Sequence, residues 1–250
     1  MSDVDVLVEV RARILRRIGE AAARTGSDPS SVDIVAVTKT VPPERIRAAI
    51  LAGFRTFGEN RVQERQAKAA AIGDTGPATA TAAATGRPTG SAAWHLVGPL
   101  QSNKARRAIE LFDVIETVDS IELAQRLDRL ASEIRPGNPY AVLLQVNVDD
   151  DAAKSGFEPA ALGRDLAAIL DLPALAITGL MTVGRLVESA EDARPTFAAL
   201  RDLSERLRAR DERLGPALSM GMSRDFAVAV EEGATIVRIG SAIFGRRATG

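Results

Sequence analysis

Short apolar runs and amphipathic segments alternate along most of the chain. Runs of this length favour buried strands, and the segments between them have the spacing of helices. The apolar runs are Ile34–Val37, Thr56–Phe57, Trp94–Val97, Val114–Val118, Ala141–Val148, Ile177–Met181, Ala217–Ser219 and Ile236–Ile239. Strand–helix alternation is typical of a parallel sheet with helices outside it. These eight units most simply close into a (β/α)8 TIM-type barrel, although an open doubly wound sheet fits the same pattern.

An additional helical pattern precedes the first apolar run. Within Val4–Ala23, the residues Leu7, Val10, Ile14 and Ile18 recur at helical spacing, with charged residues between them. We therefore expect an extra N-terminal helix that packs through this apolar face.

Several later helices carry start signals. Pro42 and Pro43 stand where a first turn would begin, and proline is well tolerated there. We expect Ser102, Asp119 and Ser223 to cap the helices that follow them, because their side-chain oxygens can accept hydrogen bonds from first-turn N–H groups.

The stretch 73–93 departs from the alternation. It consists mainly of Ala, Thr, Gly and Pro and has almost no large apolar side chain, so it cannot bury enough surface to offset the ordering of its backbone. We expect a flexible low-complexity insertion between the second helix and the third strand. The length of 250 residues suits one barrel, and we interpret residues 1–250 as a single domain.

Composition excludes several classes of function. Lys and Arg number 32 against 33 Asp and Glu, which gives no electrostatic reason to expect nucleic acid or an anionic membrane as a partner. With no Cys and a single histidine, His95, thiolate chemistry is excluded and a zinc site or a Ser–His triad is disfavoured. Residues Met1–Val10 are acidic and lack an apolar core, so we expect a soluble, cytoplasmic protein.

The candidate chemistry lies at the carboxyl ends of the predicted strands, where barrels build their sites. Residues Ser219–Ser223 are small and rich in hydroxyls and lead into a helix, and Arg238–Ser241 ends the last strand. Loops after the seventh and eighth strands often bind phosphate through N–H groups and hydroxyls. The same residues would also serve as an ordinary cap and turn, and the pattern alone does not choose between these interpretations.

Lys39 ends the first predicted strand. A lysine within apolar walls tends to lose its proton and becomes a nucleophile toward aldehydes, whereas a solvated lysine at a strand end has no such role. Together with a phosphate site on the same face, Lys39 suits pyridoxal 5′-phosphate (PLP), which carries an aldehyde and a phosphate on one ring. Arg238 would then face the pyridine nitrogen or, alternatively, pair with a carboxylate.

Six blocks of sequence resemble the pyridoxal phosphate homeostasis proteins. They cover nearly the whole chain in order, and 73–93 has no counterpart in the common core of that family. The blocks are Ala36–Lys39 (AVTK), Phe57–Glu64 (FGENRVQE), Trp94–Lys104 (WHLVGPLQSNK), Gly179–Thr182 (GLMT), Leu218–Ser223 (LSMGMS) and Val237–Gly245 (VRIGSAIFG).

This resemblance implies a barrel like the N-terminal domain of alanine racemase and PLP as its cofactor. Lys39 would form the Schiff base, and Arg238 would be the partner of the pyridine nitrogen. The other implied residues are Ser219, Ser223, Gly240, Ser241 and the backbone of Met222 around the phosphate, Asn60 beside the ring, and His95 and Met181 on the pocket wall.

The resemblance also implies a carrier or buffer of PLP without a clear reaction of its own. A weak PLP-dependent racemase or lyase is the alternative, and a Schiff-base aldolase for phosphosugars is a third. A racemase needs a second acid or base, but Tyr140 is expected at the opposite end of the barrel and His95 is the one remaining candidate. The chain also stops nine residues after Ser241, so we expect no further β-domain. PLP-dependent apoenzymes are the expected partners, and a monomer or weak dimer is the expected assembly.

Overall fold

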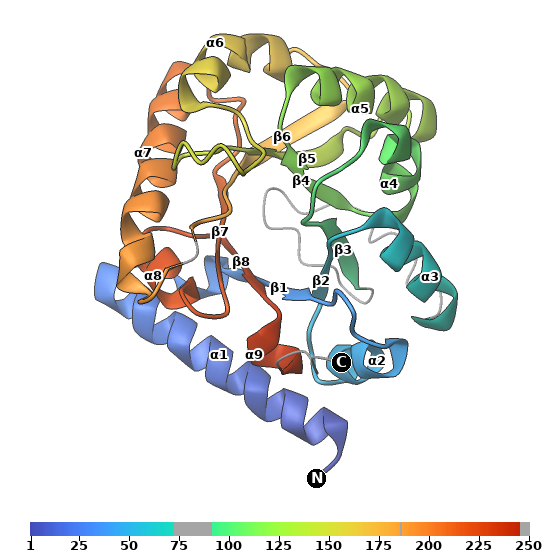
Figure 1. Ribbon diagram of the computed structural model, residues 1–250, viewed down its shortest axis with the longest axis vertical. Coiled ribbons are helices and arrows are strands. Elements are labelled where there is room, and N and C mark those ends of the chain that lie inside the picture. Colours follow the sequence, from blue (N-terminus) through green and yellow to red (C-terminus); the bar gives the residue numbers. More distant parts are fainter. Residues whose placement is uncertain (73–91, 186, 246–250) are drawn as a thin grey trace.

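The barrel predicted from the alternating pattern is confirmed. The computed structural model describes residues 1–72, 92–185 and 187–245. Its strands are all parallel and close in chain order, with β1 paired to β8 (Figure 1). They are β1 (Asp33–Val37), β2 (Thr56–Glu59), β3 (Ala93–Leu96), β4 (Val114–Val118), β5 (Tyr140–Gln145), β6 (Leu175–Met181), β7 (Ala217–Met222) and β8 (Ile236–Ile239).

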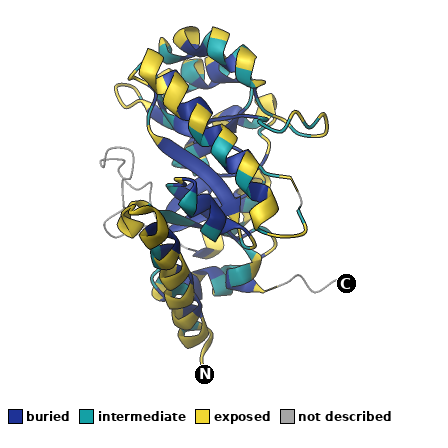
Figure 2. Cartoon of the chain, turned by 90° about the vertical axis from the view of Figure 1, so that its left-hand side faces the viewer, coloured by how far each residue is buried: buried dark blue, intermediate teal, exposed yellow. Residues whose placement is uncertain are grey.

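Helices surround the strands and shield them from solvent. Figure 2 shows the strands as a buried layer and the helices exposed along their outer sides. The helices are α1 (Asp3–Thr25), α2 (Pro43–Leu51), α3 (Val62–Ile72), α4 (Ala105–Leu111), α5 (Ile121–Ile134), α6 (Pro159–Leu170), α7 (Arg194–Arg210), α8 (Phe226–Glu231) and α9 (Ser241–Phe244). Short 3-10 turns are η1 (Pro29–Ser31), η2 (Ser102–Lys104) and η3 (Glu191–Ala193).

Helix α1 is the predicted extra N-terminal helix. Its apolar face, Leu7, Val10, Ile14 and Ile18, is buried, and α1 lies along α8, α9 and α2 (Figure 1). Ser2 caps it in a reciprocal capping box with Asp5. The helix thus covers the part of the barrel wall where the first and last strands meet.

The strands present two different faces. Trp94 on β3 points outward and stacks on Phe57 of β2 with ring centroids 5.3 Å apart. Because side chains alternate along a strand, the next residue, His95, points into the barrel. The interior holds an apolar cluster that includes Val35, Leu143 and Met181, and beside it a group of polar side chains described below.

Three predicted caps are wrong. Ser120 rather than Asp119 caps α5, through a bond from Leu123 N to Ser120 Oγ. Ser102 opens the turn η2 without a capping bond from its side chain, and Ser223 binds the backbone of the following strand–helix loop instead of α8. For Ser223 the reason is a tertiary contact, because the backbone N–H groups of Gly240 and Ala242 take up its oxygen.

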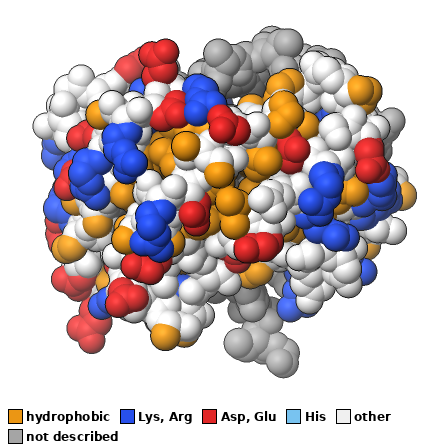
Figure 3. Space-filling view, turned by 90° about the horizontal axis from the view of Figure 1, so that it is seen from above, with side chains coloured by type: hydrophobic (Ala, Val, Ile, Leu, Met, Phe, Trp, Pro, Cys, Tyr) orange, Lys and Arg blue, Asp and Glu red, His pale blue; other side chains and the backbone are white. Residues whose placement is uncertain are grey.

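The predicted insertion ends earlier than expected, because Ala93 is the first residue of β3 and is buried. The rest of it, residues 73–91, lies outside the described residues. None of the helices in the described parts of the chain combines the length and apolarity that a membrane span requires. On the face seen in Figure 3, acidic and basic side chains are interspersed, in keeping with the net charge of −1.

Candidate functional site

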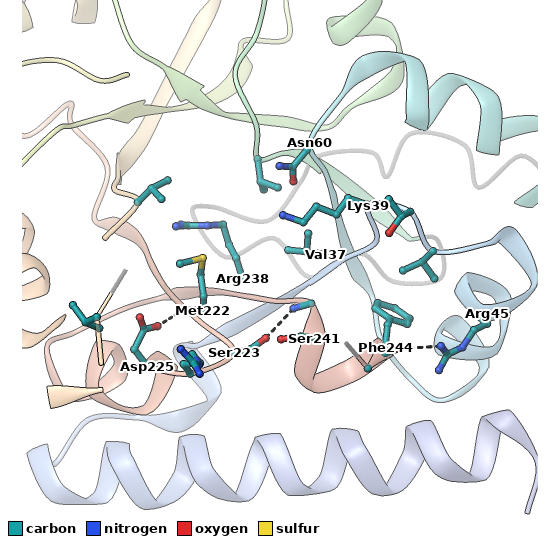
Figure 4. Close-up of a pocket in the computed structure, with 18 of the residues that line it drawn as sticks. Val37, Lys39, Arg45, Asn60, Met222, Ser223, Asp225, Arg238, Ser241 and Phe244 are labelled. Carbon is teal, nitrogen blue, oxygen red and sulfur yellow. Dashed lines mark hydrogen bonds between the residues drawn. The ribbon is translucent and has the colours of Figure 1, made fainter. Parts of the chain in front are cut away.

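A pocket of about 920 Å³ opens at the carboxyl ends of the strands. This volume is that of a small-molecule site. Most of the residues predicted for a site line it together: Lys39, Asn60, Met222, Ser223, Arg238, Gly240 and Ser241 (Figure 4). Met181 and Ser219 are fully buried within the barrel and do not line the pocket.

Lys39 reaches into the pocket from a constrained turn after β1. Figure 4 shows its amine extended toward Arg238, with Asn60 and Val37 beside it. The preceding residue, Thr38, is fully buried. The following residue, Thr40, has φ of 62°, a left-handed conformation that costs a β-branched residue about 1–3 kcal/mol. The fold therefore holds a strained backbone conformation at Thr40, directly after Lys39, as is common at functional sites.

A buried ion pair holds the turn from behind. The fully buried carboxylate of Glu59 accepts hydrogen bonds from Thr38 Oγ1 and from Lys68 Nζ, both at 2.7 Å. Lys68 Nζ also donates to Thr38 O at 2.8 Å. Burial raises the pKa of Glu59, and the bonds from Lys68 and Thr38 oppose that rise. Lys68 was not singled out from sequence, because alone it resembles an ordinary surface charge.

Replacing Lys68 with methionine should destabilise the protein by about 3–5 kcal/mol near pH 8, because it leaves the Glu59 carboxylate buried without its cation. The pKa of Glu59 is higher in the folded protein than in the unfolded chain. Stability therefore falls as the pH rises from the unfolded pKa through the folded pKa, because the folded carboxyl group must then ionise while buried. The variant raises this pKa further, and its loss should be smaller at pH 5. Urea unfolding at both pH values tests this, with Lys104→Met as control. An equal loss at both would contradict it.

Arg238 is held at the floor of the pocket by a chain of buried polar groups. Its Nη1 donates to Ser219 Oγ at 2.5 Å and its Nη2 to Thr182 O at 2.7 Å. Ser219 Oγ donates in turn to Glu116 Oε2 at 2.6 Å, and Glu116 Oε1 lies 2.6 Å from His95 Nδ1. The predicted residues Ser219 and His95 thus lie behind Arg238, inside the barrel.

Within this hydrogen-bonded group, burial and the neighbouring charges have opposite effects on the pKa values of Arg238 and Glu116. Burial lowers the pKa of Arg238, while the negative charge of Glu116 opposes that shift. Burial alone would raise the pKa of Glu116, but the hydrogen bonds and charges of His95, Arg238 and Ser219 outweigh it and hold the pKa below its ordinary value. Glu116 is therefore ionised at neutral pH. It was missed from sequence, although a glutamate within the apolar run Val114–Val118 was a signal.

Backbone amides converge at the other side of the pocket. Gly240 N and Ala242 N both donate to Ser223 Oγ, at 3.3 and 3.2 Å (Figure 4 shows the first of these bonds). Nearby, Arg45 Nη1 donates to Phe244 O at 2.9 Å and secures the end of α9. The segment after β8 thus aims two N–H groups at the hydroxyl of Ser223, which follows β7, at a single spot beside the pocket, as the phosphate interpretation requires.

The lining of the pocket is strongly basic. Within the described parts of the chain its charged residues are Lys39, Arg45, Arg185, Arg224, Arg238 and Asp225. The single acid is engaged, since Asp225 Oδ1 accepts a hydrogen bond from Met222 N at 2.6 Å. Such an excess of positive charge in a concave site favours an anionic ligand.

The two candidate bases lie elsewhere. Tyr140 begins β5 at the opposite end of the strand from the pocket, as predicted, and its hydroxyl donates to Phe112 O at 2.9 Å. Burial raises the pKa of Tyr140 above its ordinary value. His95 lies inside the barrel against Glu116 and does not line the pocket.

The fold and the pocket define a barrel of the type found in the N-terminal domain of alanine racemase. The family described as "Alanine racemase, N-terminal domain" matches residues 12–248. Alanine racemase of Clostridium difficile has the same fold at 13% identity, with a TM-score of 0.65 over 94% of this chain and 57% of that one.

Proteins with higher sequence identity to this chain show its family within this class of barrels. The chain belongs to the pyridoxal phosphate homeostasis protein family. The relative of that name in Pseudomonas aeruginosa is 40% identical over 247 residues, 98% of this chain and 97% of the relative. The one in Escherichia coli is 39% identical over 241 residues, 94% of each. PipY of Synechococcus elongatus, solved with PLP bound, is 41% identical with a TM-score of 0.76, covering 91% of this chain and 100% of PipY.

Proposed function

We propose that this protein binds PLP covalently through Lys39 and acts in the cell as a carrier or buffer of that cofactor. The observation that carries the proposal is one pocket in which a lysine amine, a buried guanidinium and converging backbone amides meet. The membership of the chain in the PLP homeostasis family and the PLP-bound structure of the relative PipY support it.

The residues that line the pocket suit the aldehyde, the phosphate and the pyridine nitrogen of the cofactor. PLP supplies an aldehyde, which condenses with a lysine amine and releases water. Lys39 would provide that amine. The amides that now converge on Ser223 Oγ would, with the hydroxyls of Ser223 and Ser241, hold the phosphate, and the basic lining would balance its charge. Asn60 would lie beside the ring and Met222 would contribute its backbone.

Arg238 and the two candidate bases bear on whether the protein carries PLP or catalyses a reaction with it. A guanidinium donates hydrogen bonds but has no proton-accepting site, so opposite the pyridine nitrogen it would leave the ring uncharged and a weak electron sink. His95 is hydrogen-bonded to Glu116, and Tyr140 is hydrogen-bonded to Phe112 O, both away from the pocket. Neither is therefore placed to act as the second acid or base of a racemase. The positions of His95 and Tyr140 support the carrier over the racemase.

The decisive experiment is to locate the adduct. Purified protein is incubated with PLP, its visible spectrum is recorded, and the sample is reduced with borohydride, digested and analysed by mass spectrometry. We expect a visible band and a single modified peptide that contains Lys39. Modification spread over Lys68, Lys104 and Lys154 would overturn the proposal. Borohydride trapping of a sugar phosphate on Lys39 without PLP would favour the aldolase.

The loaded protein then separates carrier from catalyst. Incubation with a panel of amino acids should give no racemised or cleaved product, whereas turnover would favour the racemase or lyase. We further propose PLP-dependent apoenzymes in the cytoplasm as recipients and a monomer or weak dimer as the assembly. Transfer of PLP from the loaded protein to an apo-aminotransferase, and sedimentation, test these points. Failure to activate the apoenzyme would remove the carrier role but leave a buffer.

A further inference from the structure

We propose that Glu116 is a positioning residue that holds Arg238 in place through the hydroxyl of Ser219. For the identity of the ligand this inference rests on the proposed function. The arrangement itself is a property of the chain, because the residues come from β4, β7 and β8 and meet across the barrel interior. Glu116 and Ser219 are fully buried and Arg238 is 5% exposed.

The direction of each hydrogen bond follows from the charges. A guanidinium can only donate, so Arg238 Nη1 donates to Ser219 Oγ. The single hydroxyl hydrogen of Ser219 is then directed to the ionised Glu116, which can only accept. His95 Nδ1 donates to the other carboxylate oxygen. Both oxygens of Glu116 are thereby used, and its side chain is fixed from two sides.

Ser219 also acts as a spacer. Arg238 Nη1 and Glu116 Oε2 are 4.0 Å apart, so their attraction is retained without a direct bidentate pair. Of the five N–H groups of a guanidinium, the described bonds to Ser219 Oγ and Thr182 O use two. Donors therefore remain for a ligand at the pocket floor. A carboxylate in direct contact would have occupied them.

A buried cation needs a buried counter-charge. The carboxylate of Glu116 supplies it from behind, on the side away from the pocket opening, and Asp225 adds a weaker attraction. Without that charge, the bond to Thr182 O and the weaker attraction of Asp225 would remain, and we expect the guanidinium to be held less firmly against Ser219 and to turn toward the solvent in the pocket. The energetic role of Glu116 is thus to keep Arg238 in one orientation.

A double-mutant cycle tests the coupling. Glu116→Gln keeps the shape but removes the charge, and it should weaken PLP binding by about 10- to 100-fold, the range of one charged hydrogen bond. In an Arg238→Met background the same substitution should change binding by no more than about twofold, because the group that it positions is gone. Ser219→Ala, which removes the relay, should repeat both results.

Two further measurements keep the test decisive. Glu232→Gln is the control, since Glu232 is a buried, ion-paired glutamate on the outer side of the barrel, and PLP binding should be unchanged. The same cycle on the unfolding free energy of the apoprotein reads the coupling without PLP. Equal losses with and without Arg238, in both Glu116→Gln and Ser219→Ala, would overturn the proposal. A wild type that forms no adduct would overturn the proposed function, and the apoprotein cycle would then decide on Glu116.

Discussion

Lys39→Ala should abolish the reducible PLP adduct completely while leaving the free energy of unfolding within about 0.5 kcal/mol of wild type. No other amine is offered by the described lining of the pocket, so the loss of Lys39 removes the covalent bond and leaves the amides and Arg238 as weaker, non-covalent holds. Lys39 itself forms no hydrogen bond or ion pair with the described parts of the chain. Substitutions at such positions change stability little.

The measurement combines borohydride reduction, mass spectrometry and urea unfolding on the same preparation. Lys104→Ala is the matched control, since Lys104 lies in the turn η2 and outside the pocket, and it should keep the full adduct. Retention of one specific adduct on another lysine in Lys39→Ala would refute the assignment. A large loss of stability would instead show a structural role for the amine.

Gly221→Ala should destabilise the protein by about 2–5 kcal/mol and weaken PLP binding as well. Gly221 has φ of 87°, where any side chain is strained, and an added Cβ would lie 2.5 Å from Ala229 Cβ and 3.0 Å from Phe226 Cα. Relief of that contact requires a shift of β7 or α8. Either shift moves Met222 and Ser223, which follow directly and line the pocket.

Two other glycines distinguish the cost of backbone strain from the cost of the steric contact at Gly221. Gly233 has φ of 90° but an added Cβ would find only Arg201 Cδ, at 4.0 Å, so Gly233→Ala should lose only about 1–2 kcal/mol from the backbone. Gly19 lies within α1 with nothing within 4 Å, and Gly19→Ala should gain about 0.5–1 kcal/mol. If Gly221→Ala lost no more than Gly233→Ala in urea unfolding, the close packing under the loop would not be the cause.

The strands were predictable because a parallel strand that is buried on both faces has a continuous apolar sequence. Each apolar run identified in the sequence coincides with a strand of the barrel. The residues around the pocket opening were predictable because the carboxyl ends of the strands meet there. The polar interior was not. His95, Glu116, Ser219 and Arg238 are far apart in sequence, and alternation along a strand places each inside without showing which of them touch. For that reason Ser219 was predicted at the phosphate and is found against Glu116.

The closure of the barrel has a consequence for when the site exists. Lys39 follows β1 and Gly240 follows β8, and these strands are neighbours only after the ring has closed. Arg45 of α2 then donates to Phe244 O at the same end of the seam. A chain still emerging from the ribosome has its amine long before it has the amides of the final loop. A ligand that contacts both sides of the β1–β8 seam therefore binds only the closed barrel. It stabilises the folded protein by linking the first strand–helix unit to the last.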